Sequence, residues 1–223
     1  MPYSVNGVGT GLIKASKERN IDGCIQYDAI EAFMLFYIPI IPYKAIHVLA
    51  IWQAGYEQEK YQSIKLKSSS RLVAKGMLNG WGNVLLIFGG GAFLFFSFVT
   101  LTMSRPSNIK DYMFLSGMMG LFLIGVFCKA AWYLLNDTDE RIKNIIGPHD
   151  LGTSDPFDWP DEIAQSVIKH LVAGANGQTL VEIANQALAE QNRAKAMFCV
   201  RLAMRGGQNP AAQKLFDQMM ASV

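Results

Sequence analysis

Two long apolar runs constrain this chain more than any other feature. They cover residues 83–103 and 112–135. A helix needs about 20 residues to cross the roughly 30 Å hydrocarbon core of a bilayer, and each run provides that length. The chain is 51% hydrophobic and 17% charged, and the apolar excess is concentrated in these runs. The sequence therefore predicts two transmembrane helices joined by a short extracytoplasmic loop, residues 104–111.

Lysine and arginine are distributed unevenly around the first run. The residues before it are Lys60, Lys65, Lys67, Arg71 and Lys75, and those in the following loop are Arg105 and Lys110. Cytoplasmic flanks of membrane helices are enriched in these residues, so we expect both termini in the cytoplasm. Residues 1–20 lack the apolar core of a cleavable signal peptide, and the first span is expected to act as an uncleaved anchor. The predicted protein is multi-pass.

Small residues inside the two runs predict close packing of membrane helices. They are Gly89, Gly90, Gly91, Ser116, Gly120 and Gly125. Ser116 and Gly120 have the small-xxx-small spacing that allows two helix backbones to approach. Contact within the helix hairpin and contact between copies of the chain are both open. Neither run carries an acidic residue, arginine or histidine away from its ends, which argues against transport by this chain alone.

Aromatic and basic residues are expected to anchor the helices at the cytoplasmic interface. They are Trp81, Lys129, Trp132 and Tyr133. Tryptophan and tyrosine favour the headgroup level, and Lys129 lies one turn before Trp132, from where its ammonium can reach the headgroups. A functional lysine inside the membrane is the alternative.

The region before the first span, residues 1–67, has the pattern of a cytoplasmic antiparallel β module. In YQSIKLK, residues 61–67, apolar and polar side chains alternate as in a strand with one exposed face. Asp22-Gly23 is a strong turn dipeptide. Isolated sheets of this size are marginally stable, so the module is expected to pack against the membrane surface, the C-terminal region or another subunit.

One stretch of this module, residues 32–52, is nearly all apolar: AFMLFYIPIIPYKAIHVLAIW. Its uninterrupted apolar part is too short for a span, and two prolines and Lys44 would be costly inside lipid. We expect two buried strands joined by a proline-stiffened turn at residues 41–44. His47 is then a strand residue with a satisfied or interfacial side chain. A re-entrant or interfacial segment is the alternative.

Part of this stretch carries a resemblance to a known family. FYIPIIP, residues 36–42, resembles the segment that follows the first cysteine pair of small bacterial zinc-ribbon modules, and the whole layout is similar to uncharacterised bacterial two-span membrane proteins that begin with a GxGT segment. Zinc ribbons need two cysteine pairs, whereas this region has only Cys24. The resemblance therefore implies a zinc-ribbon-like β module without metal, and no cofactor or metal ligand is expected. It also implies that the membrane is a bacterial cytoplasmic (inner) membrane.

The rest of the chain is expected to be helical. Residues 68–82 are predicted to form a juxtamembrane amphipathic connector or the start of the first helix. Residues 136–160 are predicted to form a stalk and a linker rich in proline and aspartate. Residues 161–223 are predicted to form a cytoplasmic domain of four amphipathic helices. The run at residues 180–220 resembles a tetratricopeptide-like helical pair, which implies a groove for a peptide or partner helix; a cap that stabilises a dimer is equally open. Residues 137–223 contain 8 basic and 11 acidic residues, a net charge of −3, which argues against nucleic acid as a partner.

Together these features predict an α+β membrane protein: a β module, a two-helix transmembrane hairpin and a C-terminal helical domain. We expect an integral membrane anchor or scaffold, with membrane lipid and either a protein partner or a second copy as its partners. The alternative is an accessory subunit of a membrane enzyme or transporter complex, with a site that uses Cys24, His47 or His149. No nucleophile-base pair, metal spacing or phosphate loop is found, so no catalytic, cofactor-binding or metal-binding residue is predicted.

Overall fold

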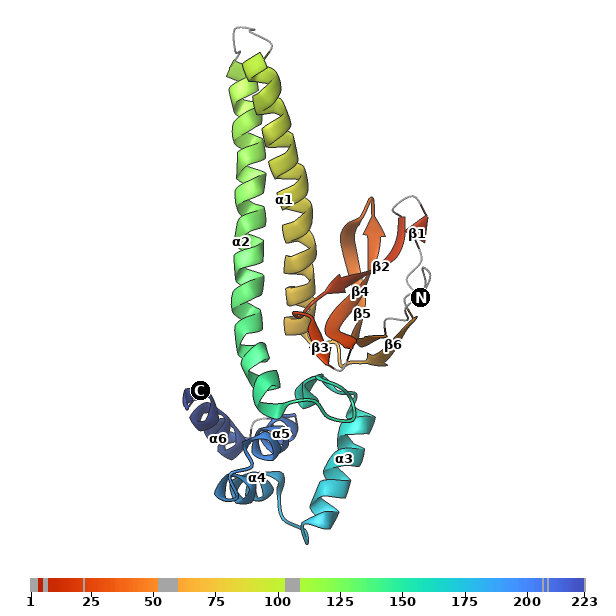
Figure 1. Cartoon of the computed structure of the whole chain (residues 1–223), viewed down its shortest axis with the longest axis vertical. Coiled ribbons are helices and arrows are strands. Elements are labelled where there is room, and N and C mark those ends of the chain that lie inside the picture. Colours follow the sequence, from red (N-terminus) through yellow and green to blue (C-terminus); the bar gives the residue numbers. More distant parts are fainter. Residues whose placement is uncertain are drawn as a thin grey trace. The chain divides into compact units, whose positions relative to one another are not determined.

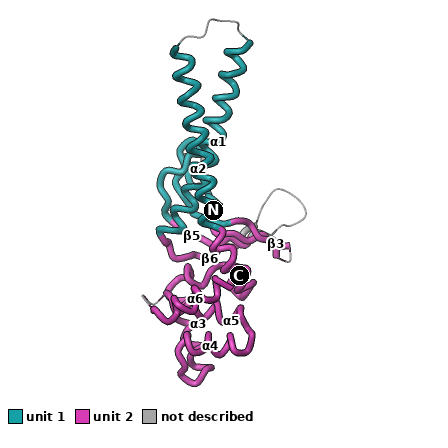
Figure 2. The backbone as a smooth tube through the Cα atoms, turned by 90° about the vertical axis from the view of Figure 1, so that its left-hand side faces the viewer, with its two compact units in different colours: residues 1–16, 29–43, 70–136 teal, residues 17–28, 44–69, 137–223 magenta. Residues whose placement is uncertain are grey.

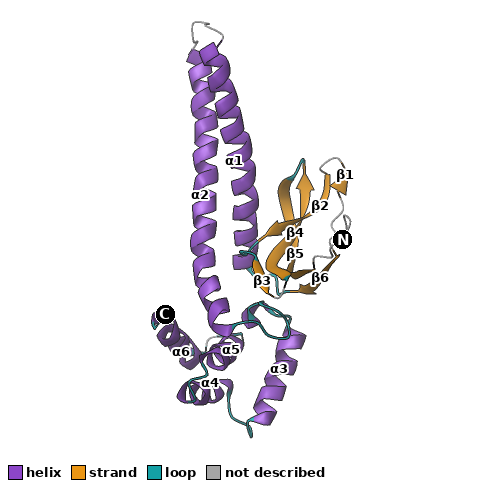
Figure 3. Ribbon diagram, in the orientation of Figure 1, coloured by secondary structure: helices purple, strands orange, loops and turns teal. Residues whose placement is uncertain are grey.

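The structure is a computed structural model of the chain. It describes residues 4–5, 8–21, 23–51, 60–102, 109–205, 207 and 209–222. In this part of the chain it contains one small antiparallel sheet, six α-helices and one short 3-10 helix (Figure 1, Figure 3). The predicted combination of an antiparallel sheet with two long apolar helices and further helices is confirmed as an α+β fold.

The sheet has the strand order β1-β2-β4-β5-β6, and β3 pairs with β4 beside this path. The strands are β1 (Ser4–Val5), β2 (Val8–Lys14), β3 (Arg19–Ile21), β4 (Cys24–Leu35), β5 (Ile38–Ile51) and β6 (Lys60–Lys65). Ile21 lies opposite Cys24, so the turn predicted at Asp22-Gly23 falls between β3 and β4; Asp22 itself lies outside the described residues. Gly23 has a positive φ of 78°, which glycine adopts without strain.

The turn predicted at residues 41–44 is wrong. Strand β5 continues through this segment, and β4 and β5 are joined instead by Phe36 and Tyr37. The pairing of β5 with β6 begins only at Ile46. Pro39 and Pro42 therefore lie in the part of β5 that precedes this pairing, where one edge of the strand needs no N–H and the other edge pairs with β4. The prediction that the apolar strand before this turn is buried is also wrong, because its side chains are largely exposed from Phe33 onward.

The two long helices are α1 (Ser70–Thr102) and α2 (Ile109–Ile146). Helix α1 begins within the predicted connector and continues without a break into the first apolar run. Helix α2 continues beyond the second run into the predicted stalk. Residues 103–108, which include most of the predicted loop, lie outside the described residues.

The remaining helices lie within residues 156–221, in the part of the chain predicted as linker and helical domain. They are the 3-10 helix η1 (Pro156–Asp158), α3 (Asp161–Gly174), α4 (Leu180–Ala189), α5 (Arg193–Met204) and α6 (Pro210–Ala221). The side chains of Thr179, Asn192 and Asn209 cap the N-termini of α4, α5 and α6 by accepting backbone N–H groups. The four helices predicted from the apolar periodicity are confirmed.

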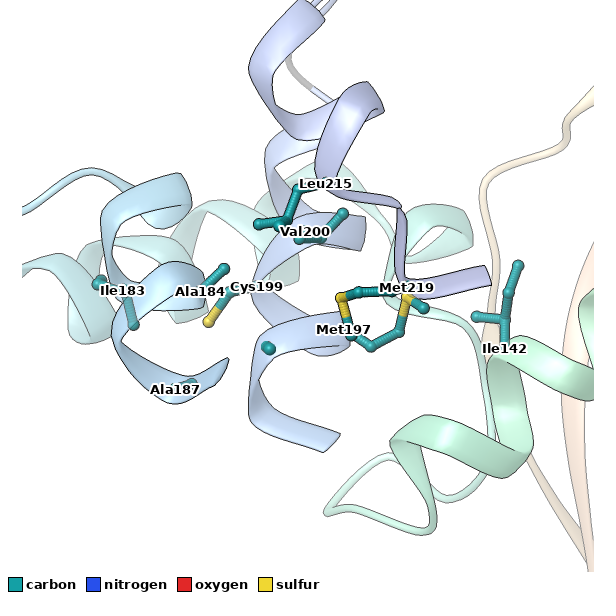
Figure 4. Close-up of a cluster of buried hydrophobic side chains, with 10 residues drawn as sticks. Ile142, Ile183, Ala184, Ala187, Met197, Cys199, Val200, Leu215 and Met219 are labelled. Atoms are coloured by element: carbon teal, nitrogen blue, oxygen red, sulfur yellow. The ribbon is translucent and has the colours of Figure 1, made fainter. Parts of the chain in front are cut away.

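The chain forms two compact units (Figure 2). Unit 1 contains residues 1–16, 29–43 and 70–136, and unit 2 contains residues 17–28, 44–69 and 137–223. Strands β4 and β5 and helix α2 each pass from one unit into the other. The core of the helical domain lies in unit 2, where Ile183, Met197, Val200, Leu215 and Met219 pack together (Figure 4).

Within unit 1 the first turns of α1 pack on the sheet through two glycines. A Cβ atom on Gly76 would lie 2.7 Å from a side-chain carbon of Ile30, and one on Gly80 would lie 2.8 Å from Pro39 and 3.2 Å from Ile13. These distances leave no room for a side chain, so the helix backbone rests directly on the strands. The Asn79 side chain adds a hydrogen bond, donating from Nδ2 to the Lys14 carbonyl oxygen over 2.8 Å.

Candidate functional site

Three of the six small residues predicted for helix packing face the other helix of the hairpin. A Cβ atom on Gly89 would lie 2.7 Å from the backbone nitrogen of Phe122, and one on Gly125 would lie 2.9 Å from that of Leu86. Gly90 faces the Phe122 ring at 3.0 Å. Because α1 and α2 approach backbone to backbone at these points, glycine is required there by contact within the hairpin.

The other three small residues lie on the outer surface of the hairpin. A Cβ atom on Gly91 or Gly120 would meet nothing within 4 Å. Ser116 is exposed, and its hydroxyl donates to the Met113 carbonyl oxygen of its own helix over 2.9 Å. The structure therefore divides the predicted set into an inner group and an outer group. Contact of the outer group with a second copy stays a prediction.

Three of the four predicted interfacial residues, Lys129, Trp132 and Tyr133, lie together at one polar contact. Lys129 donates from Nζ to Oδ1 of Asn79, and its ammonium lies 5.0 Å from the centroid of the Trp132 ring. Trp132 is buried and donates from Nε1 to the Ala15 carbonyl oxygen over 3.2 Å. Tyr133 packs edge-on against Trp132 at 4.8 Å and is exposed, and Trp81 is half-buried. The interfacial role of these residues stays a prediction, and no pattern in the sequence indicated that Asn79 joins them.

Unit 2 contains a buried charge cluster that the sequence did not reveal, formed by Asp28, His47 and Lys143. Lys143 donates from Nζ to Oδ2 of Asp28 over 2.6 Å, and Nδ1 of His47 lies 2.7 Å from Oδ1 of the same carboxylate. All three side chains are almost completely removed from solvent. The cluster joins β4, β5 and the last turns of α2 within unit 2.

The Asp28–Lys143 contact is an ion pair. Burial by itself raises the pKa of Asp28, but the positive charge of Lys143 and the hydrogen bond from His47 act against it and hold the pKa well below its usual range. Burial by itself lowers the pKa of Lys143, and the Asp28 carboxylate outweighs this effect and raises it. Each partner therefore stabilises the charged form of the other.

One ring nitrogen of His47 makes no hydrogen bond within the described residues. The contact of Nδ1 with the carboxylate makes Nδ1 the nitrogen that donates, so Nε2 is buried and has no hydrogen-bond partner in that part of the chain. Gly152 packs against this nitrogen, because a Cβ atom on Gly152 would lie 3.1 Å from it. An aspartate-histidine pair activates a hydroxyl or thiol in many hydrolases, but no such group reaches Nε2 in the part of the chain that the structure describes. The geometry therefore favours a structural role for the pair.

A loop at residues 147–159 covers this side of the sheet. The backbone N–H of Thr153 donates to Oε1 of Gln26 over 2.8 Å, and Gly152 has a positive φ of 74° where a Cβ atom would lie 2.6 Å from the same oxygen. The ring of His149 accepts the Leu151 N–H at Nδ1 and donates from Nε2 to the Ser154 carbonyl oxygen. Burial lowers the pKa of His149, in agreement with this neutral form.

A second buried ion pair holds the loop to the helical domain. Arg201 donates to Asp155 from Nη2 over 2.6 Å and from Nε over 3.0 Å, and both side chains are buried. Asp155 also caps η1 by accepting the N–H of Phe157. The pair joins the predicted linker, residues 136–160, to helix α5.

The residues proposed from the sequence for an alternative enzyme site make separate hydrogen bonds, although His47 and His149 both adjoin Gly152. Cys24 is a half-buried free thiol, His47 belongs to the charge cluster, and His149 bonds within its own loop. Across residues 4–5, 8–21, 23–51, 60–102, 109–205, 207 and 209–222, no three His, Cys, Asp or Glu side chains are arranged to hold a metal ion.

One sequence signal could have indicated the charge cluster. In CIQYDAIEAF, Gln26, Asp28 and Ile30 share one face of the strand, and Ile30 is fully buried. A carboxylate on a face that carries a buried isoleucine needs a cationic partner. The sequence does not show which lysine supplies it, because Lys143 is 115 residues away.

Comparison of the chain with protein-family models, curated proteins and solved structures finds no match.

Proposed function

We propose that this chain is an integral membrane protein that anchors or scaffolds, with its β and helical modules presenting binding surface in the cytoplasm. The observation that carries this proposal is the exposed apolar surface of α1 and α2. Only 6% of the most apolar stretch of each helix is buried, whereas a core helix of a soluble protein is mostly covered. Side chains such as Leu94 and Phe127 are 69% and 72% exposed.

This surface is more consistent with lipid than with water. Soluble monomers rarely expose a contiguous apolar patch larger than a few hundred Å². On the hairpin such residues follow both helices over many turns, from Ile87 to Leu101 and from Met113 to Leu134. The close backbone contacts at Gly89 and Gly125 are the kind that hold helices together in lipid, where water provides no driving force.

The excess of lysine and arginine before the first span supports an orientation with both termini in the cytoplasm. The proposed location is a bacterial inner membrane, in which the first span anchors the protein.

A groove in unit 2 supports the scaffolding part of the proposal. It has a volume of about 490 Å³ and is lined by Phe157, Met204, Gly207, Asn209, Pro210 and Gln213. Its apolar residues come from η1, α5 and α6, and the buried Asp155–Arg201 pair holds η1 against α5. A rigid, partly apolar groove of this kind fits a short segment of a protein partner.

The membrane part of the proposal is tested by extraction and topology. The protein should stay in the membrane pellet at alkaline pH and enter solution only with detergent. A reporter fused after Val223 should be active in the cytoplasm. Release without detergent would refute the anchor, and periplasmic activity of the reporter would refute the orientation.

The partner is tested by purification in mild detergent and mass spectrometry of what stays bound. We expect a stoichiometric protein whose recovery falls with Gln213→Arg, which adds bulk and charge at the exposed rim of the groove. Asn185→Arg, on the exposed face of α4, is the matched control and should leave recovery unchanged. Equal recovery from both variants would refute the groove as the binding site.

A further inference from the structure

The hairpin between β4 and β5 carries an exposed apolar end, which we call the hairpin tip, residues 33–41. Its exposed side chains are Phe33, Leu35, Phe36, Tyr37, Ile40 and Ile41, and those of Phe36 and Tyr37 are 66% and 70% exposed. Residues 33–41 contain no charged side chain. A surface of this composition at the end of a small sheet needs an occupant other than water.

Both faces of the hairpin tip are apolar. Alternate residues of a strand point to opposite faces, so Phe33 and Leu35 lie on the face opposite to Ala32 and Met34. Ala32 is buried, in line with the contact of this face with α1, whereas Phe33 and Leu35 are exposed. In a sheet that faces water on one side, that side carries polar residues. The outer face here carries aromatic and aliphatic ones.

The turn at the end of the tip uses residues that its backbone disfavours. Phe36 and Tyr37 have positive φ values of 51° and 66°. Two-residue hairpin turns with this conformation strongly prefer Asn-Gly, because a left-handed backbone crowds the Cβ atom of other residues. Two aromatic residues at these positions do not stabilise the turn, which indicates that their side chains make a contact outside the chain.

Contacts within unit 1 place the tip beside the start of the first apolar run. Ile30 lies against Gly76 and Pro39 against Gly80, so the hairpin advances along α1 in the direction of that run (Figure 1). From Gly80 to residue 83, where the run begins, the helix rises about 4.5 Å. From Pro39 to Tyr37 the strand extends about 7 Å. The turn therefore reaches the level of the first turn of the span.

From these observations we propose that the hairpin tip inserts into the bilayer beside α1, with the lipid headgroup and acyl-chain boundary as its occupant. This inference rests on the proposed membrane anchor. The exposed apolar side chains of the tip lie at the same height along α1 as the first turn of the span. A bilayer that surrounds the span therefore also reaches the tip. Interfacial elements penetrate roughly 5–10 Å, a depth that the turn and the first residues of each strand can provide.

The test uses the full-length protein, with its three cysteines replaced, in vesicles of phosphatidylcholine and phosphatidylglycerol. A spin label is attached at Tyr37→Cys, at Leu94→Cys on the exposed apolar surface of α1, or at Asn185→Cys on α4 as the aqueous reference. Collisions with oxygen report access from lipid, and collisions with a water-soluble nickel chelate report access from water. At Tyr37 we expect the chelate collisions to fall toward the level at Leu94 and the oxygen collisions to stay high.

The outcomes separate this inference from the proposed anchor. If the label at Leu94 collides with the chelate as the label at Asn185 does, the anchor itself fails. If Leu94 is in lipid and Tyr37 is accessible to the chelate, only the insertion of the tip is refuted. A label at Tyr37 that neither reagent reaches would mean that protein covers the tip, which also refutes lipid as the occupant.

A second variant keeps the turn and removes its aromatic side chains. Phe36→Asn/Tyr37→Gly gives the turn the residues that it prefers, so the hairpin stays folded. A label at Ile41→Cys should then gain access to the chelate relative to the same label in the chain with Phe36 and Tyr37. Unchanged access would refute the aromatic pair as the inserting group.

Discussion

The buried charge cluster allows a sharp test of the structure through Lys143→Met. This change keeps most of the volume of the lysine side chain but removes its ammonium, which lies 2.6 Å from the Asp28 carboxylate. At that distance and an effective dielectric constant of about 20, the gross attraction is about 6 kcal/mol. Much of it offsets the cost of removing both charges from water, so the loss is measured best as a difference between variants.

The expected cost of Lys143→Met is about 3–5 kcal/mol in the free energy of unfolding, because the Asp28 carboxylate stays buried without its ammonium. The double variant Asp28→Asn/Lys143→Met removes both charges and keeps an amide oxygen that can accept the hydrogen bond from His47. It leaves one amide donor unsatisfied, at about 1–3 kcal/mol. The double variant should therefore be more stable than the single variant Lys143→Met.

The assay is pulse proteolysis of the full-length protein in mild detergent across a series of urea concentrations, with the intact chain as the readout. Lys169→Met on the exposed surface of α3 is the matched control and should change stability by less than about 0.5 kcal/mol. A cost below about 1 kcal/mol for Lys143→Met would contradict a buried ion pair. So would a double variant that is less stable than the single one.

Three further predictions concern other parts of the chain. Asp155→Asn should lower the free energy of unfolding by about 3–5 kcal/mol in the same assay, because it leaves a buried guanidinium without its carboxylate. Asp217→Asn, which alters an exposed carboxylate, should lower it by less than about 0.5 kcal/mol. Equal effects of the two variants would count against the buried pair. Gly89→Ala places a Cβ atom 2.7 Å from the facing backbone and should destabilise the helix hairpin by about 1–3 kcal/mol in a titration with denaturing detergent. Gly91→Ala, which has open space around its Cβ atom, should leave the stability of the hairpin unchanged. The ion pair keeps the pKa of Asp28 low against the opposing effect of burial. The contribution of Asp28 to stability is therefore complete above pH of about 4 and is lost as the pH falls toward the folded-state pKa. Asp28→Asn should flatten this acid-induced loss of stability, and an unchanged slope of stability against pH would exclude Asp28 as its source.

The helical parts of this fold were predictable because their signals are local. The length of the two apolar runs, the apolar periodicity after residue 161 and the Asn209-Pro210 start of the last helix all act within a few turns. The structure has helices at each of these places. Helix boundaries were less clear, since the connector and the stalk continue the long helices without a change in backbone conformation.

The turn and the buried pairs were not predictable for two different reasons. Prolines indicate a turn only where a strand needs its N–H groups, and Pro39 and Pro42 precede the pairing of β5 with β6. Phe36 and Tyr37 carry no turn signal, although they form the turn. The ion pairs of Asp28 and Asp155 join residues that are 115 and 46 positions apart, a separation that no local pattern reports.

The length criterion for a membrane span is the wrong measure for the apolar stretch at residues 32–52. Residues 45–48 are buried in the protein, with Ile46 and Val48 almost fully covered, whereas the segment around Phe36 is exposed. One stretch therefore occupies two environments, and only the exposed part is available to lipid. A span must cover about 30 Å, but an interfacial hairpin needs only about 5–10 Å, which about three residues of strand provide. A segment that is too short and too rich in proline to cross a bilayer is thus long enough to enter one.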